Sequence, residues 1–245
     1  MALALVIELA LGLRGQYVFN PPFLFLGLNL AIVGGVSFII AYLSAKGYLL
    51  TGSLTLLLIT LSFVLLGIMI AMNGLFAIFS SNWAVTTAAI GLLLFSLLQV
   101  FAAVQSSFRS VQIGSEHRKS RLTLTCLFTI FLSALLSLLI VLNIFPIFFI
   151  NGIGVTLGDQ IVYAVVIFSC SLSSLLFLRL YFKSKSNVLY WYTLVLAFDA
   201  IGLYGVTLQV QFSDAVVWTG RLGSYIATIY YLIALLSTRK NSDEV

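Results

Sequence analysis

Charged residues are scarce in this sequence of 245 residues, where 8% are Asp, Glu, Lys or Arg and 62% are hydrophobic. A soluble domain usually carries about 25% charged residues, so this composition could not cover a surface that faces water. A disordered chain is excluded as well, because disorder requires low hydrophobicity and high charge. The composition therefore predicts a membrane protein with several spans, each of which needs about 20 apolar residues.

Cysteine and histidine are nearly absent. Cys126 and Cys170 each lie in an apolar run and are too few for a disulfide framework or a metal motif, so we expect small buried hydrophobic residues. His117 is the only histidine, which excludes paired histidine ligands for haem or metal. The last apolar run has no lysine before Lys240, which excludes a retinal Schiff base. With no known catalytic motif either, we expect no cofactor, no metal site and no enzymatic activity.

Seven long apolar runs predict transmembrane helices rather than strands, because their polarity does not alternate. They cover residues 22–45, 53–73, 82–107, 121–146, 160–182, 187–209 and 215–237. The apolar stretch within residues 1–20 is too short to span, so we expect either an interfacial helix or the stub of a longer segment. Pro22 then begins the first full helix. We therefore expect one all-α domain of seven transmembrane helices over residues 21–238, followed by a short cytoplasmic tail over residues 239–245.

Basic residues predict the orientation in the plasma membrane. Because consecutive spans are joined on alternate sides, ten of the twelve basic residues fall on one side. They are Lys46, Arg109, Arg118, Lys119, Arg121, Arg179, Lys183, Lys185, Arg239 and Lys240. The positive-inside rule then places the N-terminus outside and the C-terminus in the cytoplasm. The net charge of +5 indicates contact with anionic lipids of the bilayer rather than with nucleic acid.

Two ionisable residues lie within predicted spans, Asp199 in the sixth and Arg221 in the seventh. An isolated charge at mid-membrane costs about 2.5–3.5 kcal/mol on insertion scales, so we expect both side chains to face the bundle interior. Their similar depth on consecutive antiparallel helices predicts that they can pair. Three interpretations stay open: a static ion pair that fixes helix packing, a switch that responds to a ligand or a proton, and a protonated Asp199.

Other polar and aromatic residues extend this site, because helical spacing places them on shared faces. Gln99 and Asn29 add amides from the third and first runs. The candidate ligand-binding residues are Asp199, Arg221, Trp218, Tyr225, Tyr192 and Gln99. They either hold helices together by hydrogen bonds or line an outward-facing pocket for a small or lipophilic signal.

Three stretches resemble a known family. They are Asn20-Pro21-Pro22-Phe23 with Ala41-Tyr42-Leu43-Ser44-Ala45, then Leu189-Tyr190-Trp191-Tyr192, and then Trp218-Thr219-Gly220-Arg221-Leu222-Gly223-Ser224-Tyr225-Ile226. Together they resemble the MASE-type seven-helix membrane-associated sensor domains of archaeal and bacterial sensor histidine kinases and diguanylate cyclases. The resemblance implies a signal-input module that acts on output domains, and Arg221 is the residue that it most readily carries over.

We therefore expect a sensor without catalysis of its own, in which a signal near the outer half of the last two spans shifts the last span. Its expected partners are a cytoplasmic kinase or regulator of a two-component system, or an output domain beyond this chain, and a second copy in a homodimer. The alternative hypothesis is a small-solute transporter or channel, or a structural subunit of a membrane complex.

Overall fold

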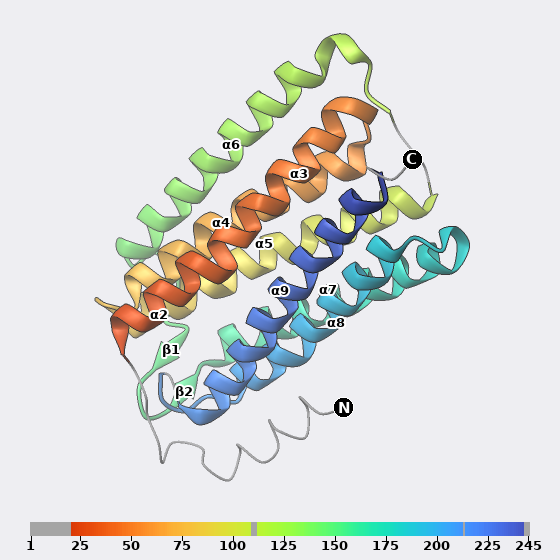
Figure 1. Cartoon of the computed structure of the whole chain (residues 1–245). Coiled ribbons are helices and arrows are strands. Elements are labelled where there is room, and N and C mark those ends of the chain that lie inside the picture. The colour runs from red at the N-terminus through yellow and green to blue at the C-terminus, as the bar shows by residue number, and fades with distance from the viewer. Residues whose placement is uncertain (1–20, 109–111, 213, 243–245) are drawn as a thin grey trace.

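A computed structural model describes residues 21–108, 112–212 and 214–242, and almost all of them are helical (Figure 1). The helices are α2 (Pro22–Leu28), η1 (Asn29–Gly34), α3 (Gly35–Thr51), α4 (Leu54–Phe76), α5 (Ser81–Phe108), α6 (Ser115–Val141), α7 (Leu157–Ser184), α8 (Asn187–Thr207) and α9 (Ala215–Ser242). The first three join into one continuous helix. With this helix counted once, six helices up to α8 are long and apolar enough to cross a membrane. The prediction of an all-α protein with several membrane spans is therefore confirmed.

Two of the predicted segments fall at the ends of the chain. The expected interfacial segment over residues 1–20 lies outside the described residues. Of the expected tail, residues 239–242 continue α9 and residues 243–245 lie outside the described part. Pro22 occupies the first turn of α2, as predicted, because its fixed φ suits that position and the first amide of a helix has no partner to lose.

The fourth predicted span is too long by five residues at its end. It was expected to reach residue 146, but α6 ends at Val141 because Asn143 adopts a left-handed backbone with φ of 55°. Pro146 then prevents the helix from resuming. The chain forms instead a short antiparallel hairpin of β1 (Phe149–Ile150) and β2 (Gly154–Val155), which the hydropathy pattern did not predict.

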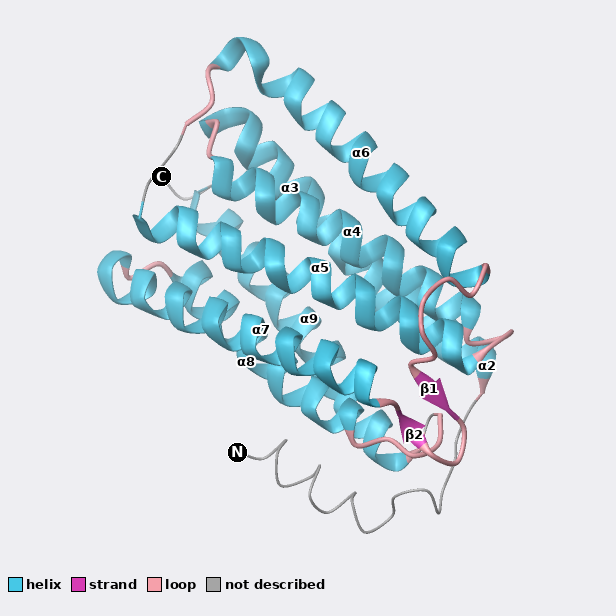
Figure 2. Ribbon diagram, turned by 180° about the vertical axis from the view of Figure 1, so that it is seen from behind, coloured by secondary structure: helices cyan, strands magenta, loops and turns pink. Residues whose placement is uncertain are grey.

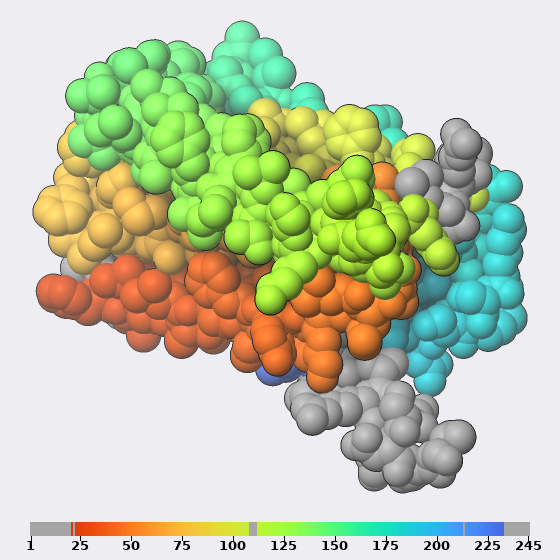
Figure 3. All heavy atoms as spheres, turned by 90° about the horizontal axis from the view of Figure 1, so that it is seen from above, coloured from red at the N-terminus to blue at the C-terminus, as the bar shows by residue number. Residues whose placement is uncertain are grey.

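The helices lie side by side in one bundle (Figures 1 and 2). α4 packs against α5, α5 against α7, α7 against α8, and α8 against α9. α9 also contacts η1 and α3, so the last helix meets the first. α6 lies at one edge of the bundle, mainly against α4, and forms the outer surface of that face (Figure 3).

Two glycines bring α8 and α9 into direct backbone contact. A Cβ on Gly202 would lie 2.7 Å from the carbonyl oxygen of Gly220, and a Cβ on Gly220 would lie 2.5 Å from that of Gly202. Small residues of this kind let membrane helices pack closely. This contact places Asp199 and Arg221, which flank the two glycines, at the same helix interface.

The two cysteines differ in environment. Cys170 is buried in α7, as predicted for a small hydrophobic residue. Cys126 is partly exposed on α6, because that helix lies at the edge of the bundle. The prediction that both are buried is therefore confirmed for Cys170 and wrong for Cys126.

Candidate functional site

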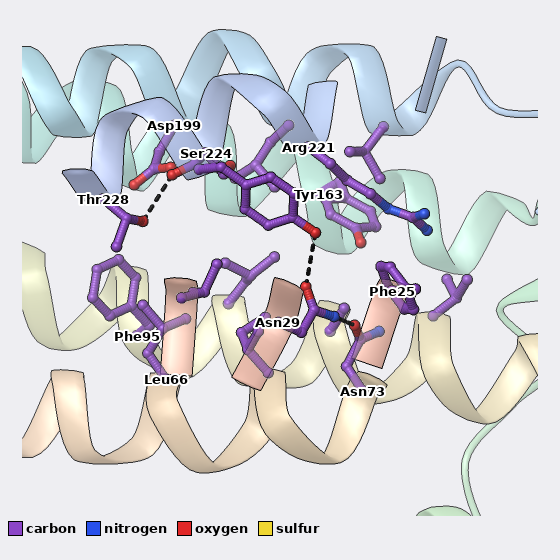
Figure 4. Close-up of a pocket in the computed structure, with 18 of the residues that line it drawn as sticks. Phe25, Asn29, Leu66, Asn73, Phe95, Tyr163, Asp199, Arg221, Ser224 and Thr228 are labelled. Atoms are coloured by element: carbon purple, nitrogen blue, oxygen red, sulfur yellow. Dashed lines mark hydrogen bonds between the residues drawn. The ribbon is translucent and has the colours of Figure 1, made fainter. Parts of the chain in front are cut away.

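A cavity of about 100 Å³ lies inside the bundle. Its lining residues belong to α2 and η1 of the first helix, to α4, α5, α7, α8 and α9, and to the loop before α9; none of the described residues of α6 lines it. Its polar lining residues are Asn29, Asn73, Tyr163, Asp199, Gln209, Arg221, Ser224, Tyr225 and Thr228. Apolar and aromatic side chains, including Phe25, Leu66 and Phe95, form the rest of the wall (Figure 4). Three of the six candidate residues, Asp199, Arg221 and Tyr225, therefore face one cavity.

A chain of hydrogen bonds crosses the bundle along this cavity. The Tyr225 hydroxyl on α9 donates to Oδ1 of Asn29 at 3.0 Å, and Nδ2 of Asn29 donates to Oδ1 of Asn73 at 2.7 Å (Figure 4). Nδ2 of Asn73 then donates to the carbonyl oxygen of Ala84 on α5 at 2.8 Å. Each step orients the next amide, because an amide oxygen only accepts and its nitrogen only donates. Four helices are thus tied together around the cavity.

Asn29 begins η1, the π-helical turn between α2 and α3. Such turns are rare within α-helices and occur frequently at functional sites. Gly34 ends this turn where the helix approaches α4: a Cβ there would lie 3.5 Å from the carbonyl oxygen of Gly67. The irregular turn therefore lies where the first helix, α4 and the cavity meet.

Arg221 extends toward the N-terminal end of α9. Its guanidinium carbon lies 4.2 Å from the ring centroid of Phe25, 5.0 Å from that of Phe212 and 5.5 Å from that of Trp218. Aromatic faces attract a cation, and the attraction strengthens where water is excluded. Asp214, whose carboxylate caps α9 by accepting from Val217 N at 3.0 Å, also interacts electrostatically with Arg221.

Asp199 occupies the opposite end of the cavity. Its carboxylate is hydrogen-bonded by the side chain of Ser224, near Thr228, while Arg221 points away from it (Figure 4). The predicted contact between Asp199 and Arg221 is therefore wrong, although both residues line the same cavity. Helical side chains lean toward the N-terminus of their own helix, so on two antiparallel helices they lean in opposite directions.

The other three candidate residues lie outside the cavity wall. Trp218 packs edge-on against Phe25, with the ring centroids 6.3 Å apart. Tyr192 and Gln99 are buried between α8 and α5, where the Tyr192 hydroxyl donates to Oε1 of Gln99. Nε2 of Gln99 donates in turn to Oγ of Ser62 at 2.8 Å, which links α8, α5 and α4.

A second cavity, of about 370 Å³, is lined by residues of α3, α4, α5, α7, α8 and α9. Tyr192 and Tyr231 line it, whereas Phe95 lines the first cavity. Phe63 lies between them, with its ring centroid 5.4 Å from that of Phe95 and 5.3 Å from that of Tyr231. Tyr192 and Tyr231 contact each other at 4.8 Å. We call these four rings the aromatic layer; it separates the two cavities.

Sequence reasoning did not select Asn73, Tyr163 or Ser224 as site residues. The second predicted span ended at residue 73, but α4 continues to Phe76, so Asn73 belongs to the helix. Its spacing from Leu66 and Ile70 is helical, and this signal was present in the sequence. Tyr163 and Ser224 carry no such signal, because a tyrosine or serine in a membrane helix is common.

The first cavity thus combines one acidic group, one basic group and a relay of amides within an apolar bundle. Comparison of the chain with protein-family models, with curated proteins and with solved structures found no significant match.

Proposed function

We propose that this chain is a seven-helix sensor of the plasma membrane, with its N-terminus outside and its C-terminus in the cytoplasm. α9 supplies the seventh crossing because it packs antiparallel to α8 at the Gly202–Gly220 contact. Among the described side chains, the basic residues near helix ends lie at the end of the bundle where α3 ends and α6 begins. They are Lys46, Arg118, Lys119, Arg121, Arg179, Lys183 and Lys185. The positive-inside rule supports a cytoplasmic position for that end.

The observation that carries the proposal is that α9, the last helix before the cytoplasmic end, forms a wall of the first cavity. Arg221 and Tyr225 of α9 contact Phe25 and Asn29 of the first helix across it. A signal that occupies the cavity changes these contacts and with them the position of α9. Such a response requires that the signal bind two arrangements of the bundle with different affinities.

The resemblance to MASE-type sensor domains agrees with this assignment of roles. Its most specific element, Gly220-Arg221, supplies both the close contact between α8 and α9 and the cation of the cavity. We propose that a cytoplasmic kinase or regulator receives the movement of α9, either as a separate partner or as a further domain. A homodimer is part of the same proposal.

A cavity-filling substitution tests the proposal without knowledge of the signal. Ala88 lines the first cavity, and Ala88→Phe would occupy it permanently. We would place spin labels at Lys46 and Thr238 in a variant without cysteines and measure the distance between them in nanodiscs. A shift of the distance distribution in Ala88→Phe is expected. The matched control Ala134→Phe, on the exposed face of α6, should leave it unchanged. Equal distributions in both variants would refute the sensor.

The second cavity favours one competing function, a small-solute transporter. Two cavities on opposite sides of a thin aromatic layer would form a path if the layer opened. Flux of labelled solutes into proteoliposomes, with Phe63→Ala as a variant that thins the layer, separates the two functions. Flux above that of empty vesicles, raised further by Phe63→Ala, would replace the sensor by a transporter.

A further inference from the structure

We propose that the second cavity binds the headgroup of a bilayer lipid, through a phosphodiester that carries a single negative charge. This site differs from that of the sensor proposal, so each can be tested without the other. Three features of the cavity support a lipid phosphodiester: hydroxyls without a partner, two helix starts that meet at the cavity, and apolar walls.

Five hydroxyls line this cavity without a hydrogen bond to any described residue. They belong to Ser44, Ser53, Thr55, Ser106 and Tyr231, on α3, at the start of α4, on α5 and on α9. Ser44 and Tyr231 are more than nine-tenths buried, with exposed fractions of 7% and 4%. Polar groups buried to this extent normally have a partner. The two hydroxyls therefore indicate that hydrogen-bonding groups of another molecule occupy the cavity.

Other hydroxyls on these helices bond within their own helix. Thr60 of α4 and Thr87 of α5 each donate to the carbonyl oxygen four residues earlier, at 2.8 Å and 2.7 Å. Ser44 and Ser106 also have a carbonyl group four residues earlier in their own helices, but they donate to no described residue. Their hydroxyls are therefore available as donors to a molecule in the cavity.

Two helices begin at this cavity. The first backbone hydrogen bond of α4 is donated by Leu57 and that of α8 by Tyr190, so the amides before them have no acceptor in their own helix. Neither helix start is capped by a side chain. Thr55 of α4 and Val188 of α8, which carry two of these amides, line the cavity. Amides at a helix start favour binding of an anion.

The helix starts also determine the charge of the ligand. Each start carries about half of a positive elementary charge, so the two together offset about one negative charge. None of the described lining residues is charged. A phosphodiester has one negative charge, and its oxygens accept hydrogen bonds from several directions, which suits donors on several helices. A phosphate monoester would bring further negative charge with no partner in the cavity wall.

The walls and the level of the cavity favour a lipid as the carrier of the phosphodiester. Leu43, Leu56 and Leu189 provide apolar surface for the first carbons of acyl chains. Lys46 of α3 and Lys183 of α7 are exposed at the same end of the bundle and attract anionic lipids. A cavity of about 370 Å³ takes roughly 25 to 37 water-sized groups, enough for a headgroup and the first carbons of its chains.

Titration of the purified full chain in maltoside micelles tests the ligand class. The probe is dioctanoyl phosphatidylglycerol, and the controls are dioctanoylglycerol, which lacks the phosphate, and decanoate, which has a carboxylate instead. We expect the phosphatidylglycerol to raise the melting temperature in a saturable way and to bind at least tenfold more tightly than either control. Equal binding by a control, or no saturable shift with the phosphatidylglycerol, would overturn the proposal. Equal binding by glycerophosphoglycerol, the headgroup alone, would replace the lipid by a soluble phosphodiester.

Two hydroxyl deletions test the position of the site. Ser44→Ala and Tyr231→Phe remove donors that have no described partner, so the lipid-free variants should keep the parent melting temperature and bind the phosphatidylglycerol at least fivefold more weakly. Ser37→Ala and Tyr48→Phe are matched controls, because their buried hydroxyls also lack a partner but line neither cavity. Both controls should bind as the parent does. Equal losses in the controls and the site variants would refute the site.

A charge substitution tests the contribution of the helix starts. Thr55→Glu would place a carboxylate in the first turn of α4, where the helix dipole favours it, and should prevent binding of the phosphatidylglycerol. Thr55→Gln has nearly the same size without the charge and should bind within threefold of the parent. Full binding in Thr55→Glu, or an equal loss in both variants, would mean that no anion is bound at the helix starts.

Discussion

α6 and α9 are nearly equal in length, with 27 and 28 residues, but their polar side chains find their hydrogen-bond partners in different places. On α6 the hydroxyls of Thr129, Ser133 and Ser137 each donate to the carbonyl oxygen four residues earlier in the same helix, at 2.9 Å. On α9, Tyr225 reaches Asn29 on the first helix. These three hydroxyls of α6 are therefore satisfied within their own helix, whereas Tyr225 of α9 depends on a partner 196 residues away in the sequence.

The surroundings of the two helices differ in the same way. Only 22% of the most apolar part of α6 is buried in the bundle, against 50% for α4 and for α5, and Leu124, Phe128 and Phe131 of α6 point outward. None of the described residues that line either cavity belongs to α6. The difference teaches that a polar residue in a membrane helix indicates a site when its partner lies on another helix.

The largest expected effect comes from separating α9 from α8. Gly220→Val would place side-chain atoms against the carbonyl oxygen of Gly202 and against Val206, so the helices must move apart. We expect the free energy of unfolding to fall by about 3 kcal/mol or more, since overpacking here meets backbone rather than a flexible side chain. Denaturant titration in mixed micelles measures it.

A second glycine serves as the control for this prediction. A Cβ on Gly27 of α2 would have no atom within 4 Å, so Gly27→Ala should be neutral or stabilise the protein by about 0.4–1 kcal/mol. If Gly220→Val unfolds at the same denaturant concentration as Gly27→Ala, the close contact between α8 and α9 is wrong.

A smaller effect is expected from breaking the hydrogen-bond chain of the cavity. Asn73→Leu would remove the partner of both Asn29 and the Ala84 carbonyl. We expect a loss of about 1–2 kcal/mol, because buried polar groups left unpaired carry a desolvation penalty. The same titration with Tyr225→Phe and with the double variant should give less than the sum of the single losses, as is usual within one network. Full additivity would mean that the two residues act separately.

The smallest effect is expected on α6. Ser133→Ala removes a hydroxyl that bonds only within its own helix, so the free energy of unfolding should change by less than about 0.5 kcal/mol. Ser174→Ala is the matched comparison, because the Ser174 hydroxyl donates to the carbonyl oxygen of Thr193 on α8 at 2.9 Å. Its loss should lower the free energy of unfolding by about 0.6 kcal/mol. A larger loss at Ser133 than at Ser174 would reverse the distinction between α6 and the helices around the cavities.

Part of the site could be predicted from the sequence. The cost of a charge in the membrane singled out Asp199 and Arg221, and helical spacing added Tyr225; all three line the first cavity. Tyr192 and Gln99 were placed in the same site but lie near the second cavity, because one face of a long helix passes two cavities at different depths.

The class of the protein was determined by the sequence alone, because the length and apolarity of each run are local properties that decide whether a segment forms a membrane helix. The direction of side chains and the choice of neighbouring helices depend on tertiary packing. Packing turned Asp199 and Arg221 away from each other, linked Tyr225 to Asn29 and left α6 at the edge. Many arrangements of apolar helices bury similar surface in lipid, so only specific contacts such as Gly202 with Gly220 select one of them.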